Sequence, residues 1–240
     1  MPRANRYIQP GCVYHLTHRC HDRRFLFRFG RDRTEYRRRL RLALGDCALS
    51  LLTYCLTSNH THLLVRAQAP DAVSRFMQKV EGEFAEYYNL RKRRSGAFWD
   101  GRYACTMVDT GTYAWNCMRY IDLNMVRAGV VKHPSAWSWC GYDELVGTRQ
   151  RYRLLDMEEV LAQCGGGSLE TFRASYRASI QEAVDRHQLA REAWWTESIA
   201  VGRESFVRGI AEATMNRREL RIDAPAAGQW TLREVADAYA

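Results

Sequence analysis

Two histidines stand one residue apart in the stretch Ser58-Asn59-His60-Thr61-His62-Leu63-Leu64-Val65, inside an apolar run. Residues i and i+2 of an extended strand point to the same face of a sheet. We therefore expect the imidazoles of His60 and His62 to lie side by side, with Thr61 on the opposite face. Two neighbouring imidazoles on a strand provide half of a divalent-metal site. The pattern also fits two polar residues at the open end of a strand, so a second signal is needed.

That second signal lies downstream, in Met118-Arg119-Tyr120-Ile121-Asp122-Leu123-Asn124-Met125-Val126-Arg127-Ala128-Gly129. The pattern predicts a helix from about residue 112 to residue 128, ended by Gly129. Tyr120 and Asn124 are four residues apart, so they share one helical face. A phenol and a carboxamide brought to a two-histidine strand would place a nucleophile beside a metal site. A tyrosine in an amphipathic helix can also serve packing alone.

Apolar periodicity predicts the elements around these two motifs. Strands are expected at 13–20, 49–56, 60–67 and 104–108, and helices at 33–46 and 72–92. This order, βαββαβ and then a helix, is that of the split βαβ, ferredoxin-like arrangement. We therefore predict an α+β fold in which helices pack on one antiparallel sheet.

Several blocks along the chain carry a family resemblance. They are Pro10-Gly11-Cys12-Val13-Tyr14-His15, Asn59-His60-Thr61-His62-Leu63-Leu64, Phe98-Trp99-Asp100-Gly101-Arg102-Tyr103, Tyr120-Ile121-Asp122-Leu123-Asn124, Ala128-Gly129-Val130-Val131 and Trp137-Ser138. With these blocks, residues 1 to 146 resemble the IS200-like single-tyrosine transposases of the HUH class, and most closely the REP-associated tyrosine transposases. Two positions depart from the family pattern: Thr61 is usually hydrophobic there, and Met125 is commonly proline.

The resemblance implies a metal-dependent enzyme that cuts and rejoins single-stranded DNA at hairpins or repeated palindromes. Tyr120 would be the catalytic nucleophile and would form a 5′-phosphotyrosine. His60, His62 and Asn124 would hold Mg²⁺ or Mn²⁺. We further expect a cytoplasmic, nucleoid-associated protein of a prokaryote, acting as a monomer or a homodimer.

The charge is unevenly placed along the chain. Residues 1–149 carry 24 Lys and Arg against 13 Asp and Glu, a net charge of +11, whereas residues 150–240 carry 12 against 14, a net charge of −2. The first part is therefore the expected DNA-binding part. The residues expected to contact DNA are Arg19, Arg23, Arg24, Arg37, Arg38, Arg41, Arg91, Lys92, Arg93, Arg94 and Arg102. Solvated helix faces would show similar charge runs.

A boundary is expected near residue 149. It would separate the nuclease domain, 1–149, from a mostly helical C-terminal extension, 150–240, with helices near 154–162, 168–195 and 202–220. The stretch from Trp230 to Tyr239 resembles the first helix of a helix-turn-helix. No run of 18 apolar residues occurs, so we expect no contact with a membrane.

Two other functions remain open from the sequence. A non-catalytic protein that binds hairpin nucleic acid would also use a ferredoxin-like sheet. A metal-dependent hydrolase that uses water as nucleophile would leave Tyr120 as a packing residue. A pure binder has no use for His60, His62, Tyr120 and Asn124 together, so the joint pattern favours an enzyme. A covalent protein–DNA adduct would separate all three functions.

Overall fold

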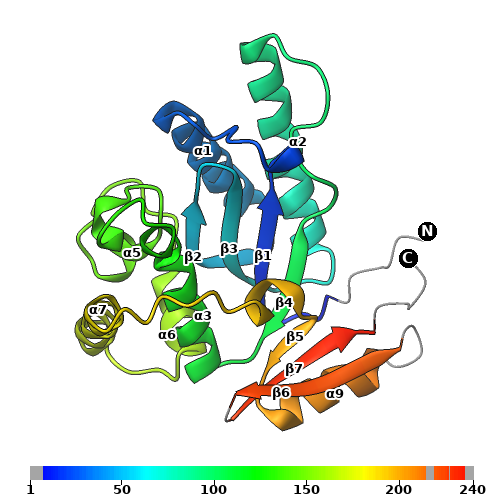
Figure 1. The fold of residues 1–240 in the computed structure, drawn as a ribbon, viewed down its shortest axis with the longest axis vertical. Coiled ribbons are helices and arrows are strands. Elements are labelled where there is room, and N and C mark those ends of the chain that lie inside the picture. The colour runs from blue at the N-terminus through cyan, green and yellow to red at the C-terminus, as the bar shows by residue number, and fades with distance from the viewer. Residues whose placement is uncertain (1–7, 215–218, 227, 236–240) are drawn as a thin grey trace.

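The computed structural model describes residues 8–214, 219–226 and 228–235, and it shows a seven-stranded sheet with helices on both faces (Figure 1). The strand order is β2-β3-β1-β4-β5-β7-β6. The first four strands in the chain are β1 (Val13–Arg19), β2 (Leu49–Leu56), β3 (His60–Ala67) and β4 (Ala104–Val108). They pair antiparallel throughout, so the predicted ferredoxin-like α+β fold is confirmed.

One face of this sheet is covered by α1 (Gly30–Asp46) and α2 (Ala72–Lys92). Alternation along β3 sends Leu63 and Val65 into the core on this side, where they join Tyr36 and Phe84 from the two helices. All elements predicted between residues 13 and 108 are present, and four of them have the predicted bounds. Their apolar periodicity was strong because every one of them has a buried face.

The opposite face of the sheet holds the residues of greatest interest. Here Leu64 of β3 packs in a second core with residues of α3 (Thr112–Asp122), α4 (Asn124–Arg127) and α7 (Leu169–Asp185). Since His60 and His62 alternate with Leu63, they also belong to this face. The short helices α5 (Tyr142–Leu145) and α6 (Met157–Gln163) lie on the same side, with η1 (His21–Arg23) and η2 (Pro134–Ala136) in the connections.

The helix predicted over 112–128 is divided in the structure. It breaks at Leu123, which has ψ near 0°, so that α3 ends at Asp122 and α4 begins at Asn124. The break comes directly after Asp122, whose buried carboxylate accepts hydrogen bonds from the hydroxyls of Thr53 and Tyr176. Gly129 ends α4 with a φ of +68°, as predicted.

The C-terminal part adds strands as well as helices. The helices are α7, α8 (Trp194–Glu197) and α9 (Glu204–Thr214), and the strands are β5 (Ala200–Gly202), β6 (Leu220–Ala226) and β7 (Gln229–Glu234). Strand β5 pairs parallel to β4, and β7 pairs antiparallel to β5, so the extension continues the sheet of the first part. The expected boundary near 149, and independent folding of 1–149, stay predictions.

The helix expected from Trp230 is wrong, because residues 229–234 form the strand β7. Pairing on both sides explains this: Leu232 lies opposite Ala200 in β5 and Ile222 in β6, and its side chain is buried. Such tertiary pairing overrides local helix propensity. Residues 236–240 of that expected helix lie outside the described residues. The helix expected over 168–195 ends at Asp185.

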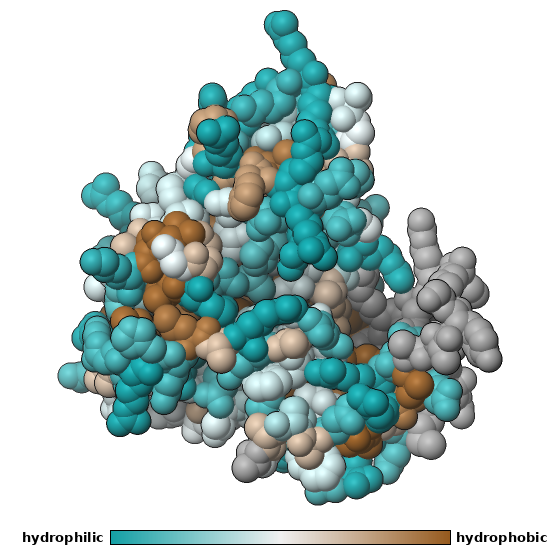
Figure 2. Space-filling view, viewed as in Figure 1, coloured by the Kyte–Doolittle hydropathy of each residue, from teal (hydrophilic) through white to brown (hydrophobic). Residues whose placement is uncertain are grey.

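No helix among the described residues is both long and apolar enough to cross a membrane. The face of the molecule drawn in Figure 2 is mainly hydrophilic, with smaller hydrophobic patches between.

Close packing at Gly141 generates a stability prediction. A Cβ added there would clash with the Oγ1 atom of Thr53 and lie 3.2 Å from the backbone nitrogen of Tyr54. We expect Gly141→Ala to lower the free energy of unfolding by about 1–3 kcal/mol, since overpacked sites force backbone shifts. The matched control is Gly209→Ala on exposed α9, where nothing lies within 4 Å. Urea unfolding followed by circular dichroism should show no loss for the control, and equal midpoints would contradict the prediction.

Candidate active site

The two histidines of β3 lie next to each other at the start of the strand. Their ring centroids are 4.7 Å apart. Both line a pocket of about 230 Å³, whose wall also includes Arg19, Asp100 and Arg102. The strand alternation predicted from the sequence therefore places both imidazoles in one cavity.

A chain of hydrogen bonds fixes the proton positions on His62. The Nδ1 atom of His15 lies 2.8 Å from the backbone oxygen of Trp195, and a carbonyl oxygen only accepts, so this nitrogen carries the hydrogen. The Nε2 atom of His15 therefore accepts from His62 Nδ1, 2.9 Å away. His62 Nε2 is left without a hydrogen, and the Nδ2 atom of Asn124 donates to it at 3.0 Å.

The same reasoning applies to His60. Its Nδ1 atom lies 2.7 Å from the carboxamide oxygen of Asn59, which only accepts, so Nδ1 carries the hydrogen. The hydroxyl of Thr57 lies 2.9 Å from the same nitrogen. His60 Nε2 is therefore also a bare nitrogen. Both histidines of the pair present the nitrogen that a metal ion would use.

Both imidazoles are neutral at neutral pH. Burial, and to a smaller extent the positive charge of Arg19, lowers the pKa of His60 to about 4. Burial also holds the pKa of His62 well below its ordinary value, and the neighbouring His60 adds to this effect. Metal ligation requires deprotonated imidazoles, so the electrostatics of the site keep the pair ready to bind a cation.

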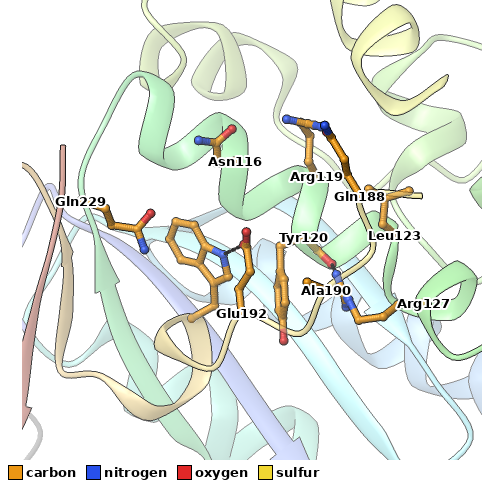
Figure 3. Close-up of a pocket in the computed structure, with 10 residues that line it drawn as sticks. Asn116, Arg119, Tyr120, Leu123, Arg127, Gln188, Ala190, Glu192 and Gln229 are labelled. Carbon is orange, nitrogen blue, oxygen red and sulfur yellow. Dashed lines mark hydrogen bonds between the residues drawn. The ribbon is translucent and has the colours of Figure 1, made fainter. Parts of the chain in front are cut away.

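Tyr120 lies beside this pair, in the wall of a second pocket. Its side chain is only 7% exposed, and its ring centroid lies 6.2 Å from that of His62. The guanidinium of Arg127 lies 4.2 Å from the centroid of the tyrosine ring and donates to the Tyr120 carbonyl at 3.0 Å. Figure 3 shows this second pocket, of about 400 Å³, with Arg127 close to the tyrosine ring. Burial raises the pKa of Tyr120, and Arg127 opposes that rise.

A segment of the C-terminal part forms walls of both pockets. We call residues 188–197, between α7 and β5, the strap. Gln188, Glu192 and Trp195 of the strap line the pocket of Tyr120, whereas Arg191 and Glu197 line the pocket of the histidines. The extension that was expected to be separate from residues 1–149 is therefore part of both pockets.

The structure places some of the arginines that were expected to contact DNA at the site. Arg19 and Arg102 line the histidine pocket, where Arg191 of the strap joins them. Arg23 and Arg24 follow Arg19 in the chain and are exposed. The wall of the histidine pocket thus carries three arginines together with the carboxylates of Asp100 and Glu197.

The arginines of α1 make contacts within the protein. Arg37 and Arg41 each donate to the backbone oxygen of Tyr152, at 3.1 and 3.2 Å. Arg38 is exposed and forms an ion pair with Glu35 at 2.8 Å. Arg37 and Arg41 therefore help to hold the loop at Tyr152, and their contact with DNA stays a prediction.

The second basic group lies at the end of α2. Arg91 pairs with the buried carboxylate of Asp32, and Lys92 lies over a phenylalanine ring. Arg93 ends the helix in the left-handed region with a φ of 49°, and Arg94 donates to loop carbonyls. Arg91 is thus partly committed to a structural contact, and the role of the group in DNA binding also stays a prediction.

One amide oxygen can join the two bare imidazole nitrogens as a third ligand. Half a turn of the Asn124 carboxamide would place its oxygen, instead of its nitrogen, toward His62 Nε2. Among the described residues no three His, Cys, Asp or Glu side chains gather as a metal site. The set on offer is therefore two imidazoles and one amide oxygen, with water completing the coordination of a hard divalent ion.

The sequence reasoning missed several residues of the site. His15 lies on β1 opposite Leu64, and it shares a face with Val13 and Thr17. Its place on the histidine face could have been found from strand alternation. Trp195 acts through its backbone oxygen, which no residue pattern can reveal. Arg127 sits one helical turn beyond Asn124, a spacing that also fits an ordinary solvated arginine.

Comparison with known proteins gives a family match for part of the chain and a solved structure with the same fold. Residues 8–124 match the family model described as "Transposase IS200 like". A solved structure of a REP-associated tyrosine transposase bound to a REP hairpin has the same fold, with a TM-score of 0.54 and 18% sequence identity over 61% of this chain and 86% of that chain. A transposase candidate from Deinococcus radiodurans R1 has a TM-score of 0.34 and 18% identity over 44% of this chain and 84% of that chain, a likeness too slight to bear on the fold.

No curated protein matches the chain in sequence. The family match covers both motifs that carry the site, from the histidine pair to Asn124. Residues 8–124 therefore match the IS200-like transposase family, and this match covers about half of the chain.

Proposed function

We propose that the protein is a single-stranded DNA endonuclease and strand transferase that uses Tyr120 as its nucleophile. The observation that carries this proposal is the meeting of Tyr120, Asn124 and His62 on one side of the sheet, with a bare Nε2 on His62. A binding protein without chemistry has no need for neutral, hydrogen-bonded imidazoles next to a buried tyrosine. The match of residues 8–124 to a transposase family model supports the same reaction class.

The proposed step is a transesterification at phosphorus. The Tyr120 oxygen forms a bond to the phosphorus atom, and the bond from phosphorus to the 3′-oxygen breaks. The phenol loses its proton and the departing 3′-oxygen gains one, so protons and charge balance overall. Arg127, 4.2 Å from the ring centroid, stabilises the developing phenolate. Because the phosphotyrosine keeps the energy of the phosphodiester, a second 3′-hydroxyl can reverse the step and join strands.

The residues present fit Mg²⁺ or Mn²⁺, held by His60, His62 and Asn124. A bound divalent ion would polarise a phosphate oxygen and ease departure of the 3′-oxygen. The protein's own part is to keep both imidazoles neutral and to aim their bare nitrogens. The Asn59 and His15 hydrogen bonds perform that aiming.

The proposed substrate is DNA with an unpaired segment, as in a hairpin or a repeated palindrome. The solved relative with this fold holds a REP hairpin, which supports the proposal. Tyr120 of α3 is recessed in the wall of a pocket, so a single strand reaches it more readily than a stacked duplex. Arg19 and Arg102 at the histidine pocket would contact its phosphates.

A covalent adduct tests the nucleophile. Wild-type protein with Mn²⁺ and a hairpin oligonucleotide should give a protein–DNA band on a denaturing gel. Tyr120→Phe should bind the same DNA and give no band, because the attacking oxygen is gone. Tyr152→Phe is the matched control, since Tyr152 is 73% exposed and does not line either pocket. Wild-type cleavage by Tyr120→Phe would show that another nucleophile acts.

The lowered pKa values predict an unusual pH range for metal binding. Protons compete with a metal only near the pKa of the ligand, and that of His60 is about 4. We expect Mn²⁺ affinity, measured by calorimetry, to hold from pH 8 to about pH 5.5, whereas a pair with ordinary values would weaken below about pH 6.5. His60→Ala and His62→Ala should abolish binding, Asn124→Ala should weaken it least, and His133→Ala should leave it unchanged. Equal affinity in the His62→Ala variant would refute the assignment.

His15 should act as a positioning residue for His62. His15→Phe removes the acceptor of the His62 Nδ1 hydrogen, and we expect a loss of Mn²⁺ affinity of about 10–100-fold. His15→Gln should restore part of it, since a carboxamide can accept from His62 and donate to the Trp195 carbonyl. Nitrogen NMR of the imidazoles reads the tautomer directly: His62 should carry its hydrogen on Nδ1 in the wild type and lose that preference in His15→Phe. An unchanged His62 tautomer in His15→Phe would contradict this positioning role of His15.

A further inference from the structure

The pocket beside Tyr120 is built from two distant parts of the chain. One wall comes from α3 and α4 and includes Arg119 and Arg127, while the other comes from the strap and includes Gln188 and Glu192. Gln229 of β7 closes one side (Figure 3). Only the first wall begins within the residues that match the family model, 8–124. The two walls and Gln229 together enclose a cavity of about 400 Å³ next to Tyr120, a size typical of small-ligand sites.

This pocket contains buried donors that have no acceptor. Arg119 Nε, Arg127 Nε and Gln229 Nε2 are each buried without a hydrogen-bond partner among the described residues. These atoms are shielded from solvent, so a ligand in the cavity would meet the outer donor groups of the same side chains. The cavity wall carries two guanidiniums and a carboxamide, and such groups bind acceptor oxygens and nitrogens.

The charges of the pocket describe the ligand more closely. Two guanidiniums favour a phosphate group, which they bind as planar donor forks. Opposing them, the Glu192 carboxylate accepts from Trp195 Nε1 at 2.5 Å and so is held in place in the pocket wall. A fixed carboxylate repels phosphate and accepts from N–H groups. One ligand that satisfies both ends is a nucleotide, with its phosphate at the arginines and its base at Glu192.

We propose that this pocket binds one unpaired nucleotide adjoining the phosphate that Tyr120 attacks. Arg119 and Arg127 would hold a phosphate, and Gln188, Glu192 and Gln229 would contact the edge of the base. Since a carboxylate accepts from exocyclic amino groups, adenine, cytosine and guanine would be favoured over thymine. The strap would thereby give the enzyme a base preference at the cut. This inference rests on the proposed function.

Abasic substitution tests the pocket. Hairpin oligonucleotides with one abasic site, moved stepwise across the cleavage position, are cleaved by the wild-type protein with Mn²⁺. We expect one position next to the cut at which the missing base lowers kcat/KM by about tenfold or more. In Gln188→Ala and Glu192→Gln that penalty should shrink to about threefold or less, because the contact is already lost. Glu192→Gln should also cut a thymine at this position as well as the other bases.

The control variant is Gln181→Ala, on the exposed face of α7 outside the pocket; it should keep the wild-type penalty. Gln188 is exposed, so its truncation leaves the core intact, and thermal unfolding checks each variant. The inference is overturned if no position beside the cut shows an abasic penalty, or if the variants keep the full penalty.

Binding measurements separate this inference from the proposed function. Fluorescence anisotropy with the Tyr120→Phe protein reads the same abasic penalty without any cleavage. If the wild type forms no adduct and the penalty is still present and strap-dependent, the pocket stands and the nuclease proposal fails. If an adduct forms and no penalty appears in either assay, the nuclease proposal stands and the pocket does not bind a base.

Discussion

A single carbonyl group orders the chemistry of this protein. Because the backbone oxygen of Trp195 can only accept, His15 must donate to it, and His62 must in turn donate to His15. The outcome is a bare nitrogen on His62 that faces Asn124. Without the Trp195 oxygen as acceptor, the imidazoles of His15 and His62 could each hold their hydrogen on either nitrogen. These hydrogen bonds link β1, β3 and the strap, so the tertiary fold sets the protonation of the site.

The same arrangement explains why both faces of the sheet matter. On one face, α1 and α2 cover apolar residues of β3 and hold the strand in register. On the other, His62 meets α3 and the strap, and its burial keeps the imidazole neutral. A one-residue slip of β3 would exchange the two sets of side chains. The large apolar core under Leu63 and Val65 thus protects the position of the histidines above it.

Much of this could be predicted from the sequence, and the failures have physical causes. Strong periodicity gave the bounds of β3 and α2, and the spacing of His60, His62, Tyr120 and Asn124 indicated a common site. The break at Leu123 escaped notice because it follows a buried hydrogen-bonded carboxylate, a tertiary feature. The strand β7 was mistaken for a helix because its pairing with β5 and β6 is not encoded locally. Trp195 contributes through its backbone, which leaves no trace in residue type.

The strap also has a consequence for how the protein is made. Synthesis proceeds from the N-terminus, and domains fold as they emerge from the ribosome. The histidine pair and Tyr120 leave the ribosome well before Trp195, yet the acceptor that orders His62 arrives only with Trp195. A nascent chain would therefore hold Tyr120 and the two imidazoles before the hydrogen bonds that order His62 have formed. Under the proposed function, competence to cut DNA would be delayed until most of the chain has been translated.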